Sequence, residues 1–575
     1  MNHLPVAPSM EPTLGREHVR ERGGPVDARV AYLGLLAIGL ALCAGLIAQL
    51  LGALIALCTN LAFYGRLSIA PASPAGHQLG WWSVLVPVAG GVIVGLLARY
   101  GSKAIRGHGI PEAMEQVLTN ESRIPASMTF LKPLSAAISI GTGGPFGAEG
   151  PIIATGGALG SVIGQWLRIN PSERKTLLAA GAAAGMAATF GSPVSAVLLA
   201  VELLLFEYRP RSLIPVALAA TAATGVRLAF VGSVPAFAMP NLTQPTDAEL
   251  AGYVLLGAVI GLASVFVTRA VYAVEDGFER VPIHWMWWPA IGGLAIGLVG
   301  LIEPRTMGVG YDNIEHILAG TLLPGAVLVL VGLKFISWSI ALGSGTSGGT
   351  LAPLFTFGGG LGALLGPLIG LDPRLSALVG MAAMFAGASR ALLASVVFAF
   401  ETTRQPIGLL PLLGGCAAAF LISSLLMRNS IMTEKIARRG VRVLGEYQAD
   451  HLDQLFLRDV ARKPVITLLA SQTVAEARSL PIPHQGYPVL DGDGHVIGVI
   501  TQKDLRAEVS PETALKSLIR RPAVVIAEDC SLRDAADTMA REGFGRLPVM
   551  KGDTMVGIVT RSDLVHAHRS RLAHG

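Results

Sequence analysis

Residues 151–164 read PIIATGGALGSVIG, and residues 353–366 read PLFTFGGGLGALLG. The two stretches lie 202 positions apart and share six of fourteen residues without a gap: one proline, one leucine and four glycines. Each is followed by GMAA, at 185–188 and 380–383, and then by an apolar stretch that ends in Glu202 or Glu401. Two blocks repeated in the same order predict that this part of the chain consists of two homologous halves.

The sequence around this repeat is apolar, and the sequence after it is not. Hydrophobic residues make up 52% of the 575-residue chain and charged residues 14%. Only 37 charged residues lie in 31–430, whereas 38 lie in the much shorter stretch 431–575. The first composition excludes an ordinary soluble enzyme and the second is typical of one globular unit. The net charge of +5 comes without a basic stripe, so we expect no nucleic-acid partner.

The apolar region divides into segments near the length that a membrane span needs. Many contain glycine, proline or a lone charge, which is typical of helices that stop inside the membrane and line a substrate site. We therefore predict a multi-span α-helical membrane protein with inverted-repeat halves and broken helices, in contact with membrane lipid. The segments lie at about 31–58, 81–99, 132–165, 176–205, 212–232, 251–274, 285–302, 322–342, 350–370, 376–399 and 407–427.

These patterns predict the domain order. The first apolar run is too long for a signal peptide, and no disulfide framework is present, so we expect both termini in the cytoplasm and the body in the plasma or inner membrane. The predicted parts are an N-terminal tail (1–30), a transmembrane domain (31–428, with halves at about 31–232 and 250–428), a linker (429–450) and two small soluble domains (451–508 and 509–570).

The soluble part contains a repeat of its own. GYPVLDGDGHVIGVITQKDL (486–505) and GRLPVMKGDTMVGIVTRSDL (545–564) each predict two strands, with Thr and Asp opening a helix. This α/β pattern resembles a tandem pair of CBS domains. The resemblance places Thr501, Asp504, Thr560 and Asp563 where that family binds adenine nucleotides (ATP, ADP or AMP). The same residues can simply cap their helices, and both interpretations stay open.

Three short segments of the membrane region share one design: GHGIP (107–111), GAEGP (147–151) and GTLAP (349–353). In each, a glycine precedes a proline in the first turn of an apolar helix, where proline is tolerated. Backbone N–H groups at such a helix start are unpaired and lie at the positive end of the helix dipole. Several starts that meet within a membrane would bind an anion without a full positive charge, so that it can also leave.

Glu149 is the unusual residue of these segments. A carboxylate inside an apolar, glycine-rich stretch of a membrane protein is costly, which makes it a functional candidate. At a helix start it can occupy the anion position when no free anion does, and its protonation would then be coupled to anion occupancy. The alternative is a helix-capping glutamate.

Together, the three segments and the trailing CBS pair resemble the CLC family of chloride channels and proton/chloride antiporters. The resemblance implies a homodimer with one chloride pathway per subunit and two oppositely oriented halves. It places Glu149 at the gating glutamate. It assigns anion binding to the first motif (His108, Gly109), to an outer site (Ala148, Glu149, Gly150) and to a central site (Thr350, Leu351).

The chain also departs from the family. His108 stands where serine is frequent, Leu351 where phenylalanine is usual, and Met432 where a tyrosine often contacts the anion. Leu203 stands where antiporters have an inner proton-carrying glutamate, and a leucine cannot carry a proton. Glu202 or Glu207 could supply that relay instead.

The leucine at position 203 favours a gated, channel-like chloride pathway over a proton-coupled chloride antiporter, and both hypotheses remain open. A CBS-regulated divalent-cation transporter is a remote alternative, because the membrane region has no acidic cluster to bind such an ion. We expect no enzyme activity, no catalytic residues, no metal site and no required cofactor.

Overall fold

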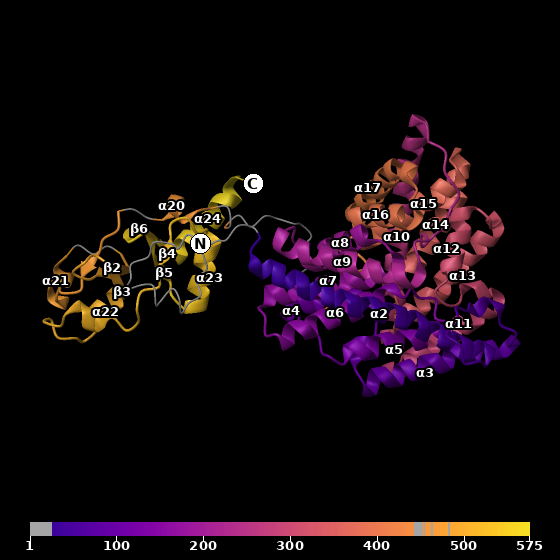
Figure 1. The fold of residues 1–575 in the computed structure, drawn as a ribbon, viewed down its shortest axis with the longest axis horizontal. Coiled ribbons are helices and arrows are strands. Elements are labelled where there is room, and N and C mark those ends of the chain that lie inside the picture. The colour runs from indigo at the N-terminus through magenta and orange to yellow at the C-terminus, as the bar shows by residue number, and fades with distance from the viewer. Residues whose placement is uncertain (1–25, 442–451, 453–454, 462–463, 481–483, 575) are drawn as a thin grey trace. The chain divides into compact units, whose positions relative to one another are not determined.

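The computed structural model describes residues 26–441, 452, 455–461, 464–480 and 484–574. It divides into a helical body, Pro25–Gly445, and a tail unit that holds Glu446–Gly575 (Figure 1). Most of the predicted N-terminal tail (1–30) and the part of the predicted linker (429–450) after residue 441 lie outside the described residues. Residues 429–441 belong to the helical body, where they include a short helix, Glu434–Arg438.

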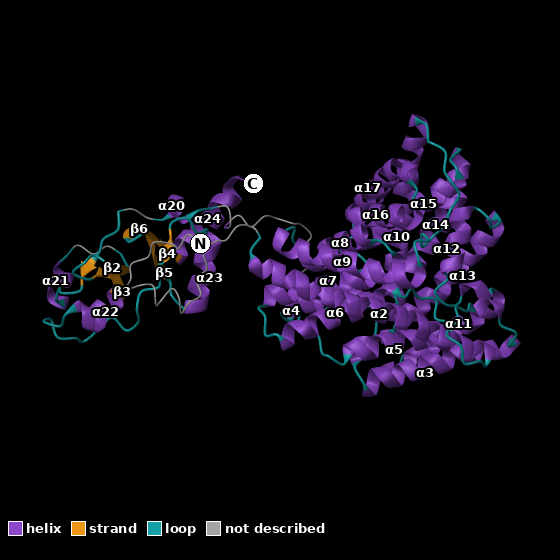
Figure 2. Ribbon diagram, in the orientation of Figure 1, coloured by secondary structure: helices purple, strands orange, loops and turns teal. Residues whose placement is uncertain are grey.

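The helical body contains no β-strand within its described residues (Figure 2). Its helices are α2 (Ala28–Tyr64), α3 (Leu85–Tyr100), α4 (Ile110–Thr119), α5 (Met128–Gly141), α6 (Glu149–Trp166), α7 (Pro171–Phe190), α8 (Pro193–Ala200), α9 (Pro210–Val231), α10 (Asp247–Glu279), α11 (Trp288–Ile302), α12 (Tyr311–Ala319), α13 (Pro324–Gly343), α14 (Leu351–Leu365), α15 (Pro373–Ser389), α16 (Leu392–Thr403), α17 (Leu409–Leu426) and α18 (Glu434–Arg438).

Eight helical stretches among the described residues are long and apolar enough to cross a membrane. Several others are much shorter, as the glycine and proline interruptions predict; α8 and α16 are apolar but too short to span. The predicted segment 132–165 is two helices, α5 and α6, separated by the turn at 142–148. The eight stretches are Ala28–Tyr64, Gly80–Tyr100, Pro210–Val231, Asp247–Glu279, Trp285–Ile302, Pro324–Gly343, Leu351–Ile369 and Pro406–Leu426.

The sequence repeat is a structural repeat. Helices α4 to α7 have counterparts in α12 to α15, and the matching ends lie 202 residues apart: α6 begins at Glu149 and α14 at Leu351, while α7 begins at Pro171 and α15 at Pro373. The prediction of two homologous halves is confirmed.

Paired glycines explain why the repeat keeps its composition. A Cβ atom on Gly156 would collide with the carbonyl of Gly181 where α6 crosses α7, and a Cβ on Gly181 would collide with the carbonyl of Gly156. Gly358 of α14 and Gly380 of α15 have the same mutual relation. The two helix pairs therefore pack backbone against backbone, a contact that only small residues allow.

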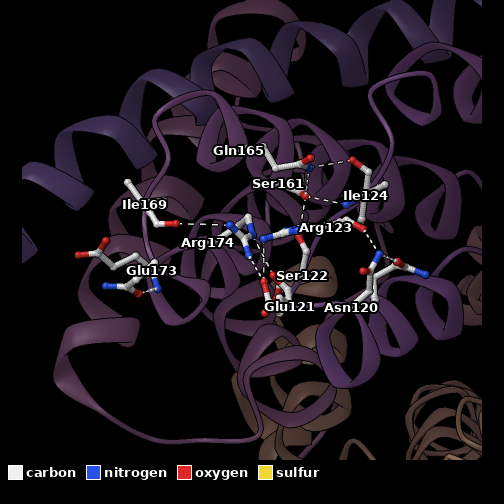
Figure 3. Close-up of polar contacts among 12 residues, drawn as sticks. Asn120, Glu121, Ser122, Arg123, Ile124, Ser161, Gln165, Ile169, Glu173 and Arg174 are labelled. Atoms are coloured by element: carbon white, nitrogen blue, oxygen red, sulfur yellow. Dashed lines mark hydrogen bonds and ion pairs between the residues drawn. The ribbon is translucent and has the colours of Figure 1, made fainter. Parts of the chain in front are cut away.

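The loop after α4 is fixed to α6 and α7 (Figure 3). Ser161 of α6 accepts a hydrogen bond from the Ile124 N–H (2.9 Å) and donates one to the Ser122 carbonyl (2.6 Å). Arg174 of α7 donates through Nε to the Glu121 carbonyl (2.8 Å). Helix α4 is therefore tied at its end to the helix that begins with Glu149.

The tail unit contains two three-stranded sheets of the same design. In each, the first strand runs parallel and the third antiparallel to the middle strand, in the orders β1-β2-β3 and β4-β5-β6. The predicted duplication is thus present in the fold. The elements are α20 (Leu457–Val460), β1 (Leu468–Leu469), α21 (Val474–Ser479), β2 (Gly486–Leu490), β3 (Val496–Thr501), α22 (Gln502–Arg506), β4 (Ile526–Ala527), α23 (Leu532–Glu542), β5 (Arg546–Lys551), β6 (Thr554–Thr560) and α24 (Arg561–His574).

Candidate functional site

The three glycine-proline segments meet inside the helical body. Gly147 and Gly349 form an antiparallel bridge in which each N–H donates to the other's carbonyl, at 3.2 and 2.9 Å. Gly107 forms a parallel bridge with Ser347. The starts of α4, α6 and α14 are therefore joined by direct backbone contact, although they are far apart in the sequence.

Glycine is required where these segments touch. A Cβ atom on Gly150 would collide with the carbonyl of His108, and a Cβ on Gly109 would lie 2.6 Å from the carbonyl of Gly150. Gly109 also has a φ of 94°, a conformation that residues with a side chain rarely adopt. These contacts allow the α4 and α6 starts to approach at backbone distance.

The Glu149 carboxylate lies at this junction and is fully buried. Oε1 accepts a hydrogen bond from the Tyr311 hydroxyl at 2.8 Å, whereas buried Oε2 has no hydrogen-bond partner among the described residues. Oε2 lies directly beside Gly147, whose backbone is bridged to Gly349 just before α14. The acid side chain from α6 therefore reaches the start of α14.

Tyr311 belongs to a fourth segment that the sequence analysis missed. GVGYD (308–312) precedes α12 as GHGIP precedes α4, and the two glycines of each segment have positive φ. The segment has no proline, so it does not fit the glycine-proline pattern that the other three helix starts share. Its Gly-x-Gly spacing, 201 positions after that of GHGIP, was the available signal.

Two buried lysines hold these equivalent loops. Lys132 of α5 donates from Nζ to the carbonyls of Ile105 and Gly107, both at 2.8 Å. Lys334 of α13, 202 positions later, lies 3.4 Å from three carbonyls of the other loop, those of Thr306, Gly308 and Val309. Each lysine thus satisfies backbone carbonyls that face the interior.

The first motif is held by a charged pair. The Gly109 N–H donates to Glu112 Oε2 (2.7 Å), and Lys435 of α18 donates to Oε1 of the same carboxylate (2.8 Å). The Gly109 amide, a candidate anion donor, is therefore engaged by Glu112 in this structure. His108 is buried beside it, and its Nδ1 has no partner among the described residues.

The remaining predicted anion residues surround the same junction. Thr350 and Leu351 are fully buried at the start of α14, and the Thr350 hydroxyl has no partner among the described residues. Ala148 is partly buried and Gly150 is buried at the start of α6. Met432 is also fully buried, in the segment after α17. His108 and Thr350 thus each carry a buried polar atom without a partner that could donate to a bound anion, whereas Glu149 Oε2, an acceptor, would need a donor such as water.

The two candidates for a proton relay have other contacts. Glu202 accepts hydrogen bonds from the N–H groups of Leu393 and Ala394 at the start of α16, both at 3.0 Å. Glu207 accepts from the Ser212 hydroxyl (2.6 Å) and forms an ion pair with Lys175 (3.5 Å).

Glu401 repeats the arrangement of Glu202 in the opposite direction. It accepts hydrogen bonds from the N–H groups of Val194 (3.1 Å) and Ser195 (2.8 Å) at the start of α8. Each half of the body therefore supplies a carboxylate that caps a helix of the other half.

The predicted nucleotide residues of the tail unit form two helix caps. Asp504 accepts from the N–H (2.9 Å) and hydroxyl (2.5 Å) of Thr501, and Asp563 accepts from those of Thr560 at 2.8 and 2.7 Å. Asp504 also lines a cavity of about 280 Å³, together with Arg520, Arg546 and others. Burial raises the pKa of Asp504, but the hydrogen bonds from Thr501 outweigh it and leave that pKa below its ordinary value.

The amino-acid sequence matches two models of known protein families. The family model described as "Voltage gated chloride channel" matches residues 90–424, and the model described as "CBS domain" matches residues 457–511 and 515–570. The chain therefore belongs to the CLC family of voltage-gated chloride channels and carries two CBS domains.

The chain is similar to proteins with different printed activities. It is 28% identical over 498 residues to "Chloride channel protein CLC-f" of Arabidopsis thaliana, covering 74% of this chain and 62% of that one. It is 29% identical over 363 residues to "H(+)/Cl(-) exchange transporter ClcA" of Vibrio parahaemolyticus, covering 60% and 76%. Its fold matches a slow cyanobacterial Cl⁻/H⁺ antiporter with a TM-score of 0.61 and 24% identity, covering 70% and 97%. The chain thus spans about three fifths of the plant relative.

Proposed function

We propose that this protein transports chloride across a membrane through a channel-like pathway at the joined starts of α4, α6 and α14, with Glu149 as the gate. The observation that carries the proposal is the bridge between Gly147 and Gly349 with the Glu149 carboxylate beside it. It brings the positive ends of two helix dipoles, one from each half, to one buried place. Partial charges of this kind hold an anion weakly enough for it to move on.

The contacts of the inner glutamates support a channel over an antiporter. A proton relay needs an acid that can release its proton toward the site. Leu203 has no such group, Glu202 caps α16, and Glu207 is paired with Ser212 and Lys175. Antiport remains the second candidate, because the Vibrio relative is named as an exchanger.

Flux through proteoliposomes tests this proposal. With a chloride gradient imposed, we expect chloride flux without uphill proton movement. Proton movement against its gradient would establish antiport instead, and the absence of any chloride flux would contradict both candidates. In the same vesicles Glu149→Gln, which cannot ionise, should conduct independently of pH.

The remaining features of the proposal follow the family resemblance. The protein is a homodimer with one pathway per subunit, lies in a plasma or inner membrane with both termini in the cytoplasm, and transports rather than catalyses. The tail unit binds an adenine nucleotide that regulates the body. The cavity beside Asp504 supports this role, because it combines a carboxylate for a ribose with arginines for phosphate groups.

A further inference from the structure

Tyr311 is the only side chain among the described residues that forms a hydrogen bond with the Glu149 carboxylate. The two residues come from different halves: Glu149 begins α6, and Tyr311 begins α12. The contact therefore joins the candidate gate to the opposite half of the body.

The Tyr311 ring is held in place by aromatic neighbours. It packs edge-on against Phe190, with ring centroids 5.7 Å apart, and against Phe237 at 6.0 Å. Phe398 contacts both of these rings. Gly310, directly before Tyr311, has a φ of 75° and turns the chain into α12. The hydroxyl is thus fixed in position by packing that does not involve Glu149.

Tyr311 also borders a cavity of about 870 Å³. Helix α2, the loop at 69–74 and residues 307–312 line this cavity, and Ala148 lies in its wall next to the gate. Asp312 is the only charged residue in the lining. Glu149 itself is not among the lining residues, whereas its hydrogen-bond partner Tyr311 and its chain neighbour Ala148 are.

We propose that Tyr311 is the positioning residue of the gate: its hydroxyl holds the Glu149 carboxylate against the starts of α6 and α14. This inference rests on the proposed function, in which the carboxylate and chloride compete for one position. The hydrogen bond from Tyr311 stabilises the arrangement in which the carboxylate occupies that position. Removing the hydrogen bond should therefore make chloride a better competitor for the position.

Tyr311→Phe tests the proposal because it keeps the ring and removes only the hydroxyl. In proteoliposomes we expect the chloride concentration for half-maximal flux to fall about tenfold, with maximal flux little changed. A tenfold change corresponds roughly to the free energy of one hydrogen bond to a charged group. In a Glu149→Ala background the same substitution should have no further effect. Tyr64→Phe is the control, because that hydroxyl donates to the Ser73 carbonyl, away from the gate.

The outcomes separate the inference from the proposed function. If Glu149→Ala leaves the chloride dependence unchanged, the gate itself is refuted. If Glu149→Ala changes it but Tyr311→Phe does not, or if Tyr311→Phe acts equally without Glu149, only the role of Tyr311 is overturned. Should Tyr311→Phe fail to fold, Tyr311→Met replaces it in the same two backgrounds: a downward shift confined to the background that keeps Glu149 supports the proposal, and an absent or equal shift overturns it.

Discussion

Lys132 and Lys334 occupy equivalent positions in the two halves, and both bind backbone carbonyls of a loop that leads into the site. A buried ammonium group costs free energy unless hydrogen bonds compensate for its lost hydration. Lys132 has two contacts of 2.8 Å, whereas those of Lys334 are all 3.4 Å. Because shorter contacts of this kind are stronger, we expect the first loop to depend more on its lysine.

Replacing each lysine by methionine measures this difference. Lys132→Met leaves the Ile105 and Gly107 carbonyls unpaired, which should lower the free energy of unfolding by about 1–3 kcal/mol. Lys334→Met should cost less. Thermal unfolding of the purified variants in detergent compares the two, and an equal or reversed order would contradict the ranking.

Individual site residues differ in how far the sequence could predict them. Glu149 and the three glycine-proline starts were predictable, because buried charge and helix-start chemistry leave a local pattern. Tyr311 was not, because its role depends on where α12 packs against α6. The sequence likewise could not show that the Gly109 N–H donates to Glu112 rather than to an anion, because this depends on where the Glu112 carboxylate lies in the folded chain.

The glycine crossings between helices give a second test. Gly156→Ala places a Cβ against the Gly181 carbonyl where α6 meets α7, so the helices must separate. We expect a loss of about 1–3 kcal/mol in stability, the usual cost of overpacking. Gly157→Ala is the matched control on the next residue, because its Cβ would lie an ordinary 3.5 Å from Leu178.

Thermal unfolding and dimer content in detergent would follow both alanine variants. The Gly157 variant should match or exceed the parent protein, since alanine favours helix over glycine. If both variants behaved alike, the backbone contact between α6 and α7 would not be the reason for the conserved spacing of the repeat within this chain.

The sequence predicted where the helical segments lie better than it predicted where individual helices begin and end. The apolar stretches located the membrane region and the glycines located its repeat. Hydropathy alone joined α5 to α6 and α7 to α8, because the turns between them, at 142–148 and 191–192, are short and contain no charged residue. The carboxylates that cap the starts of α16 and α8, Glu202 and Glu401, come from distant segments and leave no local signal.

At the scale of the whole molecule, the tail unit adds a candidate nucleotide site to the proposed transport function. Asp504 of its first Thr–Asp pair lines a cavity with three arginines, Arg520, Arg521 and Arg546. The lowered pKa of Asp504 keeps its carboxylate charged from mildly acidic to neutral pH. Asp504→Asn should therefore weaken ATP binding to the full-length protein about tenfold, if the carboxylate binds the ribose. Asp534→Asn is the control, because Asp534 forms the same kind of cap with Ser531 but does not line the cavity.

Calorimetry in detergent gives the affinities. Equal affinities for the parent and Asp504→Asn would place any nucleotide elsewhere, and the absence of heat at millimolar ATP would leave the tail unit a role in assembly only. The duplicated strand-and-helix pattern predicted the sheets of this unit. It did not predict the cavity, which brings Arg520 and Arg521, between the two copies, together with Arg546 of the second copy.

The exchange of caps between Glu202 and Glu401 has a consequence for the origin of the fold. Neither half completes its own short helix, so an ancestral polypeptide of half this length would have needed a second, upside-down copy of itself to supply the missing carboxylate. Fusion of two such copies into one gene would have made that mutual dependence permanent. Each half could then diverge only while it kept the carboxylate that caps the short helix of the other half.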